Sequence, residues 1–580
     1  MNDRLDTSFM RSLCMGQIEQ GVLFPFPVLS ADQQSTLHEI RSALEDLLGP
    51  RQADFRQWDA AGEMPATFIE ELRSFGLFGL IIPEQFGGMG LGNMAYSRTL
   101  QEIGRYDGSV AVTVGAHNSI GMRGVLLFGS EEQKSRYLPR LASGELIAAF
   151  CLTEPGAGSD AAAVRTTAVR EGDHWILNGN KLWITNGGIA GFFTVFARTG
   201  NDAAQGKMTA FMVTRDMPGV SVGPHEDKMG LRASSTTTVM FDSVRVPDQN
   251  VLGQPGKGFK IAMQILNNGR TGLGGGSVGS MKHLIELTTK QATERKTFGE
   301  PISSYGLIKD KVGRMVVDCY TSEAVVTMVG GLIDRGFQDY AVEAAISKVY
   351  ATECLSRTAD EALQIAGGNG FMRDYPYERI ARDSRINRIF EGTNEILRLF
   401  IALTAMNDVA SQLEELAASM KDVLHDPIKG FGVLSDYALR QAQIRTGRGG
   451  SAKLEGLHEA IQAQAGVFET ETRYLAQATD RILRKHGKNI VGKQFATKRL
   501  AEIMIDLFVM ACTLSRVQAS IEAHGVAKAA HEIAVLQVFC REAGVRMKQN
   551  FRRIDNNDDE AIKALADDAF EAGRFRWDTI

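Results

Sequence analysis

The feature that most constrains the fold is a change, made twice along the chain, in the spacing of apolar residues. Over residues 31–147 they recur every three or four positions, as in HEIRSALEDLL and FIEELRSFGLFGLI, which predicts helices. Over residues 148–255 the spacing falls to two, in segments such as FFTVFART, KMTAFMV and STTTVMF, which predicts strands. From Gly258 to about residue 406 helical spacing returns. Two helical regions should therefore flank a small β domain.

The rest of the chain predicts a further helical region. A looser stretch, residues 426–456, is followed by FETETRYLAQATDRILRKH and RLAEIMIDLFVMACTLSRVQASIEA, which again have helical spacing. The predicted fold class is mostly α with a central β domain. We predict four domains: an N-terminal helical domain (1–147), a β-barrel-like domain (148–255), a helical bundle that carries the catalytic site (256–425) and an extra C-terminal helical domain (426–580).

Composition narrows the classes of function. The formal net charge is −5, which argues against a nucleic-acid-binding surface. The six cysteines are scattered without a CxxC pair, and the ten histidines form no ligand-spaced cluster, so we expect neither a disulfide framework nor a metal site. Asp3 and Asp6 lie in an N-terminus without the features of a signal or transit peptide. No uninterrupted apolar stretch approaches the length of a membrane span.

One hairpin is predicted within the β region. HWILNGNKLWIT contains Asn178-Gly179 between two alternating runs, and Asn-Gly is the strongest short signal for a type I′ turn. The same stretch continues into Trp183, Ile184 and Thr185. A Trp in a strand is more often part of a core than the wall of a cofactor site.

A candidate catalytic base lies in RIFEGTNEILRLF. Glu391 precedes Gly392 and Thr393, which are turn and cap residues, and a helix that is apolar nearly all round follows. Taken alone, a Glu before a helix is usually only a favourable partner of the helix dipole. Burial would raise its pKa and the dipole would lower it, so the sequence leaves the direction of the net shift open.

Three further stretches each give a weak signal. FCLTEPGAGSD is a Gly-rich turn with two hydroxyls, Thr153 and Ser159, but it lacks the Lys of a phosphate-binding loop. ERKTFGEPI places Arg295 and Phe298 at a helix end, where an Arg is usually solvated. QIAGGNGF reads alone as a turn that ends a helix.

Together, these stretches resemble the acyl-CoA dehydrogenase family, most closely its very-long-chain members. CLTEPGAGSD, LWITNGG, ILNNGR, RKTFGEPI, QIAGGNGF and RIFEGTNEILRLF occur in the family's order, and the resemblance runs from FPFPVL near residue 24 into the C-terminal helices. It implies noncovalent FAD, a homodimer in which Gln364 to Gly368 reach the FAD of the neighbouring subunit, and the following cofactor-binding residues: Phe150, Leu152, Thr153, Gly158, Ser159, Trp183, Ile184, Thr185, Arg295, Phe298, Gln364, Ala366, Gly367, Gly368, Thr393 and Glu395.

The resemblance also implies the reaction. Glu391 would remove a proton from the carbon beside the thioester of a long- or very-long-chain fatty acyl-CoA, while the flavin accepts a hydride from the next carbon to give a trans-2-enoyl-CoA. Electrons would pass to an electron-transferring flavoprotein, as in fatty acid β-oxidation. Some family members carry the base at the position of Gly269 instead. The implied substrate-contacting residues are Ser159, Asn267, Asn268, Gly269, Arg270, Phe390 and Gly392.

Two other functions stay open at this point. An acyl-CoA oxidase would pass the electrons to oxygen, although oxidases are generally longer than this chain. A noncatalytic assembly partner would not need Glu391, which this chain retains.

Two regions have two interpretations each. The glycines of TGLGGGSVGS (271–280) either allow close helix packing or make room for a long acyl chain, and the resemblance favours the acyl chain. Residues 427–457 combine Phe431, Leu434 and Tyr437 at helical spacing with several basic residues. This segment is either a mobile loop or, as in very-long-chain members, a peripheral membrane contact. Without a presequence, we expect a cytoplasmic bacterial protein, in contact with the inner membrane in the second case.

Overall fold

The computed structural model describes residues 7–200, 206–422 and 453–579. Contacts between Cα atoms divide the chain into two compact units, Phe26–Ile396 and a second that combines Met1–Pro25 with Leu397–Ile580. We describe each unit by itself. The predicted division into four domains is finer than this and stays a prediction.

The unit Phe26–Ile396 begins with helices, as predicted. Ser30 and Ser130 each start a helix with a capping box, in which the side chain of a Gln three residues later bonds back to the cap. A π-helical turn, His117–Gly121, interrupts the region and was not predicted. The α-helices are α3 (Ala31–Leu48), α4 (Gln52–Ala61), α5 (Ala66–Ser74), α6 (Asn93–Tyr106), α7 (Gly108–Ala116), α8 (Arg123–Phe128) and α9 (Glu131–Ala142).

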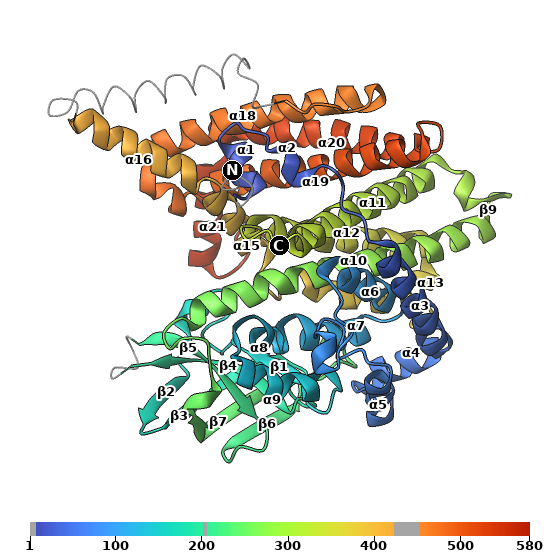
Figure 1. Ribbon diagram of the computed structural model, residues 1–580. Coiled ribbons are helices and arrows are strands. Elements are labelled where there is room, and N and C mark those ends of the chain that lie inside the picture. The colour runs from blue at the N-terminus through green and yellow to red at the C-terminus, as the bar shows by residue number, and fades with distance from the viewer. Residues whose placement is uncertain (1–6, 201–205, 423–452, 580) are drawn as a thin grey trace. The chain divides into compact units, whose positions relative to one another are not determined.

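The predicted β region forms one eight-stranded sheet (Figure 1). Its hydrogen-bonded order is β6-β7-β3-β2-β4-β5-β8, and β1 pairs with β4 in parallel. Alternate residues such as Leu177, Phe193 and Phe211 fill its core. The strands are β1 (Ala148–Cys151), β2 (Thr167–Glu171), β3 (His174–Thr185), β4 (Phe192–Thr199), β5 (Lys207–Thr214), β6 (Val220–His225), β7 (Thr236–Pro247) and β8 (Val251–Leu252).

The predicted hairpin at Asn178-Gly179 is wrong. β3 runs through both residues as one strand, paired with β2 and β7, with a register shift against β7 between Leu177 and Gly179. A Cβ on Gly179 would lie 2.3 Å from Thr166 Oγ1, so this glycine permits close packing and not a turn. The chain turns instead between β2 and β3, where Gly172 has φ 63°.

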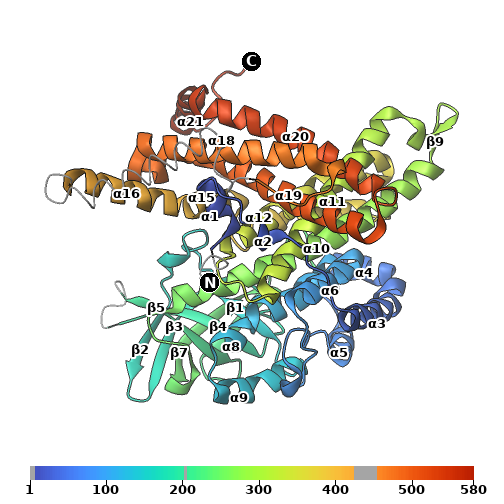
Figure 2. The same ribbon diagram turned by 45° about the horizontal axis from the view of Figure 1, so that its top comes forward.

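Helices return after the sheet. α10 (Gly258–Glu294), α11 (Gly306–Asp334) and α12 (Ala341–Ala366) pack against one another, and α10 also packs against α6 (Figures 1 and 2). A short hairpin, β9 (Lys296–Thr297) and β10 (Glu300–Pro301), separates α10 from α11. The unit continues with α13 (Gly368–Phe371) and α14 (Tyr377–Arg385), and it includes the first residues of α15 (Asn394–Ala405).

The glycine row of α10 serves close helix packing. A Cβ on Gly275 would lie 2.6 Å from the Ser97 carbonyl oxygen of α6, and one on Gly279 would lie 1.9 Å from that of Gln101. On another face, a Cβ on Gly274 would meet Val326 of α11 at 2.9 Å. Since side chains here would push neighbouring helices apart, these glycines no longer argue for a long acyl chain.

α11 qualifies the expectation that no segment could span a membrane. By length and composition alone it contains a sufficiently apolar window, but 67% of that window is buried within the protein. The helix contacts α6, α10 and α12, so the apolar residues are part of a helical core.

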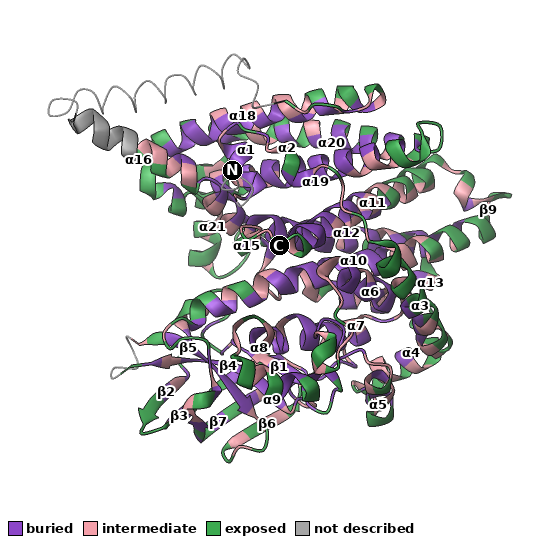
Figure 3. Ribbon diagram, in the orientation of Figure 1, coloured by how far each residue is buried: buried purple, intermediate pink, exposed green. Residues whose placement is uncertain are grey.

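The second unit is helical. Its elements are α1 (Phe9–Cys14), α2 (Gln20–Leu23), the rest of α15, α16 (Asn407–Asp422), α18 (Gln462–His486), α19 (Gln494–His524), α20 (Ala530–Asp555) and α21 (Asp559–Ala572). α19 is buried over most of its length, whereas α21 has no buried residue (Figure 3). α1 and α2 were not predicted; Phe9 of α1 packs against Phe468 and Phe508 at ring-centroid distances of 6.4 and 6.3 Å.

One predicted segment falls largely outside the described residues, and two expectations concern cysteines and metal sites. The predicted membrane-contacting segment, residues 427–457, lies outside them except for residues 453–457. All six cysteines are described; all are buried, and none forms a disulfide. Within the described ranges no group of three or more His, Cys, Asp or Glu side chains is arranged to hold a metal ion.

Candidate active site

Glu391 lies in a tight turn that leads into α15. Its φ is 55° and that of Gly392 is 92°, so two successive residues have left-handed backbone. Such a conformation is unfavourable for a residue with a side chain, and it is often found at functional sites. Thr393 Oγ1 accepts a hydrogen bond of 3.3 Å from the Ile396 N–H, which confirms Thr393 as the cap.

The carboxylate of Glu391 lies against Gly269 of α10. A Cβ placed on Gly269 would be 3.2 Å from Glu391 Oε2 and 3.4 Å from Oε1. The two positions from which family members are expected to present a base therefore converge on the same space. Gly269 leaves room for the carboxylate, which a side chain at that position would crowd.

The surroundings of Glu391 determine whether its pKa is raised or lowered, which the sequence left open. The Oε2 atom is covered and has no hydrogen-bond partner among the described residues. Burial raises the pKa of Glu391 to about 7, against the opposing effect of the nearby cations Lys348 and Arg270. A carboxylate with a pKa near neutrality can both accept and release a proton at physiological pH, which suits a general base.

The predicted substrate-contacting residues of α10 divide into two groups. Arg270 is buried, donates to Asn267 Oδ1 at 2.7 Å, and has a pKa lowered by burial to about 10. It therefore stays charged beside Glu391. Asn268 is instead held in a buried network, where it accepts from Arg123 Nη2 at 2.7 Å and donates to the Tyr340 hydroxyl oxygen at 2.8 Å.

The Gly-rich turn after β1 is anchored by a buried ion pair. Lys181 Nζ, on β3, donates to Glu154 Oε1 at 2.7 Å and to the backbone oxygens of Leu152 and Phe196. Glu154 also accepts bonds from the Thr166 N–H and hydroxyl. Burial acts to raise the pKa of Glu154, but Lys181 and these hydrogen bonds hold it below its usual value. The start of the turn is thus fixed.

The rest of this turn is open. A Cβ on Gly156 or Gly158 would have no atom within 4 Å, and Ser159 is exposed. Trp183 has φ 56° and is 63% exposed, in a part of β3 where the register is irregular. An exposed indole beside open backbone fits a planar cofactor such as the flavin of FAD.

The predicted flavin contacts next to these residues differ in exposure. Phe150 and Thr153 are partly exposed, and Leu152 is buried. Thr185 is partly exposed, whereas Ile184 is buried in the sheet core, so only its backbone can reach a ligand.

A second group of predicted cofactor residues lies on exposed surface. Arg295 follows the end of α10, and Phe298, in the β9–β10 hairpin, is 98% exposed. Gln364, Gly367 and Gly368 are exposed where α12 ends. The structure therefore leaves the side chains of Arg295, Phe298 and Gln364 accessible to a ligand.

The remaining predicted site residues lie near Glu391 or α12. Ala366 is buried at the end of α12. Phe390 and Gly392 flank Glu391 and are partly exposed, as is Thr393, and Glu395 is exposed in the first turn of α15.

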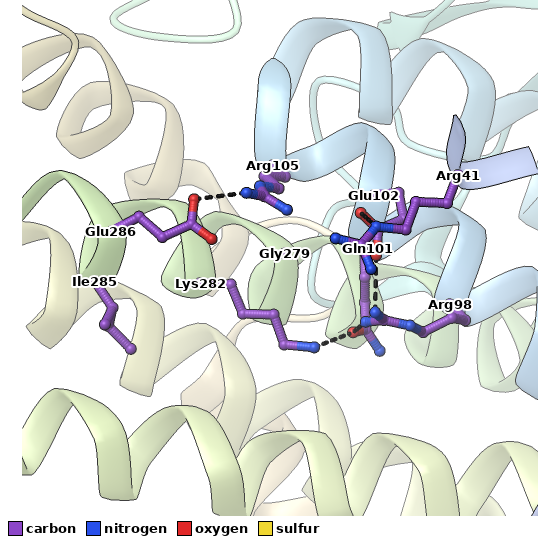
Figure 4. Close-up of a pocket in the computed structure, with 9 residues that line it drawn as sticks. All are labelled: Arg41, Arg98, Gln101, Glu102, Arg105, Gly279, Lys282, Ile285 and Glu286. Atoms are coloured by element: carbon purple, nitrogen blue, oxygen red, sulfur yellow. Dashed lines mark hydrogen bonds and ion pairs between the residues drawn. The ribbon is translucent and has the colours of Figure 1, made fainter. Parts of the chain in front are cut away.

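A cavity of about 330 Å³ lies elsewhere, between α3, α6 and α10 (Figure 4). Its walls are charged, and the charges satisfy one another. Arg98 pairs with Glu102 at 2.8 Å, and Arg105 with Glu286 at 2.8 Å. Such a lining does not suit an acyl chain.

Two lysines that are buried in the described part of the chain were not predicted from the sequence. Lys181 and Lys348 are both 0% exposed. In the sequence, each of them is a lysine within an apolar stretch, in NKLWIT and in AAISKVYA, and this is the signal that could have indicated burial. Neither stretch alone shows which acceptor the ammonium would reach.

Comparisons with known proteins agree with this arrangement. Family profiles described as the N-terminal, middle and C-terminal domains of acyl-CoA dehydrogenase match residues 30–145, 149–244 and 256–406. A profile described as the ACAD9/ACADV C-terminal domain matches residues 459–575. The chain therefore belongs to the acyl-CoA dehydrogenase family, and the prediction of an acyl-CoA dehydrogenase is confirmed.

Individual relatives extend over most of the chain. The human mitochondrial very long-chain specific acyl-CoA dehydrogenase is 42% identical over 560 residues, 95% of this chain and 84% of the relative. A probable acyl-CoA dehydrogenase of Bacillus subtilis is 36% identical, over 87% of this chain and 82% of the relative. The structure of an acyl-CoA dehydrogenase from Bacillus anthracis in complex with FAD matches with a TM-score of 0.80 and 31% identity, over 94% of this chain and 91% of that chain. The prediction of FAD is confirmed by this comparison.

Proposed function

We propose that the protein converts long- or very-long-chain fatty acyl-CoA to trans-2-enoyl-CoA, with Glu391 as the catalytic base. The observation that carries the proposal is the carboxylate of the partly exposed Glu391, which lies against Gly269 with a pKa of about 7 and whose covered Oε2 atom has no hydrogen-bond partner among the described residues. A structural carboxylate would have such partners.

The residues around Glu391 support removal of a proton next to a thioester. Arg270, and Lys348 in its protonated form, supply positive charge near the carboxylate; burial lowers the pKa of Lys348 to about 7. This charge keeps part of the Glu391 population ionised at neutral pH. The α10 surface at Asn267 to Arg270 and the turn at Phe390 to Gly392 would position the acyl-CoA. Bound FAD would accept the hydride from the neighbouring carbon.

The flavin would lie against the open part of the Gly156 to Ser159 turn and the exposed Trp183. The exposed Arg295 and Phe298 would hold the dinucleotide portion, and Gln364 to Gly368 would act on the FAD of the second subunit in a homodimer. Thr393 and Glu395 would complete the cofactor shell. In this arrangement, Gly367→Val should lower FAD occupancy, because Gly367 has φ 62° and lies at the exposed end of α12.

Substrate length and electron acceptor follow from similarity. The 42% identity to very long-chain specific enzymes, together with the matching C-terminal profile, favours long acyl chains. An electron-transferring flavoprotein is the proposed acceptor. In the cell, the proposed location is the bacterial cytoplasm with peripheral contact to the inner membrane through residues 427–457.

The test is Glu391→Gln, which is nearly isosteric. The purified variant should keep FAD and bind palmitoyl-CoA, while flavin reduction falls by about 10²- to 10⁴-fold. Flavin bleaching at a near wild-type rate would contradict the assignment. In the wild-type protein, turnover with an electron-transfer dye but not with oxygen would separate a dehydrogenase from an oxidase, and no turnover with either would indicate an assembly partner.

A further inference from the structure

Lys348 is a buried lysine to which the reaction above assigns no contact with substrate or cofactor. It lies in the middle of α12 and is 0% exposed. Its Nζ donates to the Gly392 carbonyl oxygen at 2.8 Å and to Asn394 Oδ1 at 2.7 Å. Both acceptors lie in the short segment Gly392–Asn394, which follows Glu391 as a turn and ends at the first residue of α15. Since burying an ammonium is costly, a lysine that bonds to a turn in this way needs a reason beyond packing.

The turn is tied to α12 at more than one point. Asn394 Nδ2 donates to Thr352 Oγ1 at 3.2 Å and to Glu353 Oε1 at 3.0 Å. Thr352 follows Lys348 by four residues and lies on the same face of the helix. α12 therefore holds the turn through its first and third residues, Gly392 and Asn394.

This attachment acts on an unfavourable backbone. Glu391 has φ 55°, a left-handed conformation that is unfavourable for a residue with a side chain. Such strain persists only where the surrounding structure fixes the backbone. The bond from Lys348 to the Gly392 carbonyl fixes the peptide immediately after Glu391, and with it the direction in which the Glu391 side chain leaves the chain.

The charged and titratable groups that face Glu391 come from three helices. They are Lys348 of α12, Arg270 of α10 and, more weakly, the Tyr96 hydroxyl of α6. Lys348 itself also faces Glu353 and Glu395, and burial lowers its pKa to about 7, so it is charged over the acid part of the pH range. Lys348 and Glu391 form no ion pair within 4.0 Å in the described structure, so the lysine acts on the carboxylate through space without occupying its oxygens.

We propose that Lys348 is a positioning residue for the base: it holds the Gly392–Asn394 turn in the conformation that aims Glu391 past Gly269, and its charge keeps that carboxylate ionisable without a direct hydrogen bond. The inference rests on the proposed role of Glu391. A carboxylate held by a salt bridge would be a weak base, and without a nearby cation the desolvation of this carboxylate would raise its pKa further. Contact with the backbone of the turn avoids both outcomes.

The experiment compares two charge-removing variants, Lys348→Met and Lys348→Gln. In FAD-loaded protein, Lys348→Met should lower palmitoyl-CoA-dependent flavin reduction at pH 7 by about 10- to 100-fold. The acid limb of the pH profile, where the rate falls as Glu391 becomes protonated, should move to higher pH by about 1–3 units. Lys348→Gln keeps a hydrogen-bond donor without the charge. It should show the same movement of the acid limb, with a rate at high pH closer to wild type.

Thr352→Val is the matched control, because it removes a bond to Asn394 and leaves the charge in place. Its acid limb should coincide with wild type. A second readout does not depend on turnover: an infrared titration of the Glu391 carboxyl, with Glu391→Gln as the blank, should show the same upward movement in both Lys348 variants. This measurement remains valid if Lys348→Met folds poorly, since Lys348→Gln suffices.

The outcomes separate the two proposals. If the Lys348 variants keep the wild-type acid limb and carboxyl titration, the positioning role is wrong. If Glu391→Gln itself reduces flavin at a near wild-type rate, the assignment of the base fails first. Loss of activity in Lys348→Met without a change in either titration would indicate a structural role only and would also overturn the inference.

Discussion

Among the residues that the structure describes, two buried lysines each lie near a glutamate, and the two arrangements differ in what the ammonium touches. In the β domain, Lys181 bonds directly to Glu154, and the carboxylate accepts further bonds from Thr166 and the Arg165 N–H. In the helical region, Lys348 bonds to Gly392 and Asn394. Glu391 is left with a covered oxygen that has no hydrogen-bond partner in the described residues.

The two carboxylates respond in opposite directions. The pKa of Glu154 is lowered, since hydrogen bonds and the adjacent charge outweigh burial. The pKa of Glu391 is raised to about 7, since burial outweighs cations that do not touch it. The same pair of residue types thus gives a structural anchor when the charges meet and a group that can exchange protons when they are held apart.

The largest expected effect comes from moving the base. Glu391→Gly should lower flavin reduction by about 10²- to 10⁴-fold, because the proposed general base is lost. Adding Gly269→Glu should recover at least about tenfold of this, since the two positions face the same space. Single-turnover flavin bleaching with palmitoyl-CoA measures both variants.

Ile120 would crowd a side chain placed at residue 269 in that experiment. Its Cγ2 atom would lie 2.7 Å from a Cβ at residue 269, so the relocated base should work better when Ile120→Ala is added. Gly269→Gln in the same background is the control without a base. Equal rates for the Glu and Gln variants would show that space, and not a carboxylate, limits the reaction.

The next effect is on the stability of the β domain. Lys181→Met leaves the Glu154 carboxylate buried without its cation and should lower the free energy of unfolding by about 3–5 kcal/mol. Removing both charges, with Lys181→Met and Glu154→Leu together, should recover most of that loss. Urea unfolding of wild type, Lys181→Met and the double variant measures these free energies. A double variant no more stable than Lys181→Met would contradict the view that Lys181 and Glu154 compensate each other's buried charge.

A smaller effect concerns Glu391 and pH. The folded-state pKa, about 7, exceeds the usual 4.5, so the stability that protonated Glu391 contributes is present below pH 4.5 and is lost as the pH rises through 7. Glu391→Gln has no carboxyl group at this position and therefore does not lose stability in this way as the pH rises. At pH 8 the variant should therefore be more stable than wild type by about 1–3 kcal/mol, and near pH 5 the difference should largely vanish.

Urea unfolding at both pH values, on protein without FAD, measures this difference. The corresponding change at the other glutamate, Glu154→Gln, should destabilise the protein at pH 8, because it removes the negative charge that Lys181 needs. A stabilising Glu154→Gln would remove the distinction between the two sites.

The smallest effect tests the cap of α15. Thr393→Ala removes the bond to the Ile396 N–H and should cost about 1 kcal/mol of stability. The cap carries no charge, so the acid limb of the flavin-reduction profile should stay where it is in wild type. A movement of that limb as large as in Lys348→Met would show that turn geometry alone sets the ionisation of Glu391.

The sequence by itself determined the order of helical and β regions, the family and the identity of Glu391 as the candidate base. These follow from local periodicity and from motifs that are contiguous in the chain. The error at Asn178-Gly179 has the same origin, since an Asn-Gly pair signals a turn locally. Whether Gly179 turns or packs depends on Thr166, which only the folded sheet brings to it.

Tertiary structure alone decided the chemistry of the site. Gly269 and Glu391 are 122 residues apart in sequence, and only packing of the turn against α10 shows that they share one space. Tertiary packing likewise assigned the glycines of α10 to contact with α6 and α11, and paired Lys348 with the turn and not with the carboxylate. A pKa depends on burial and on charges within a few ångströms, and those neighbours come from helices distant in the sequence.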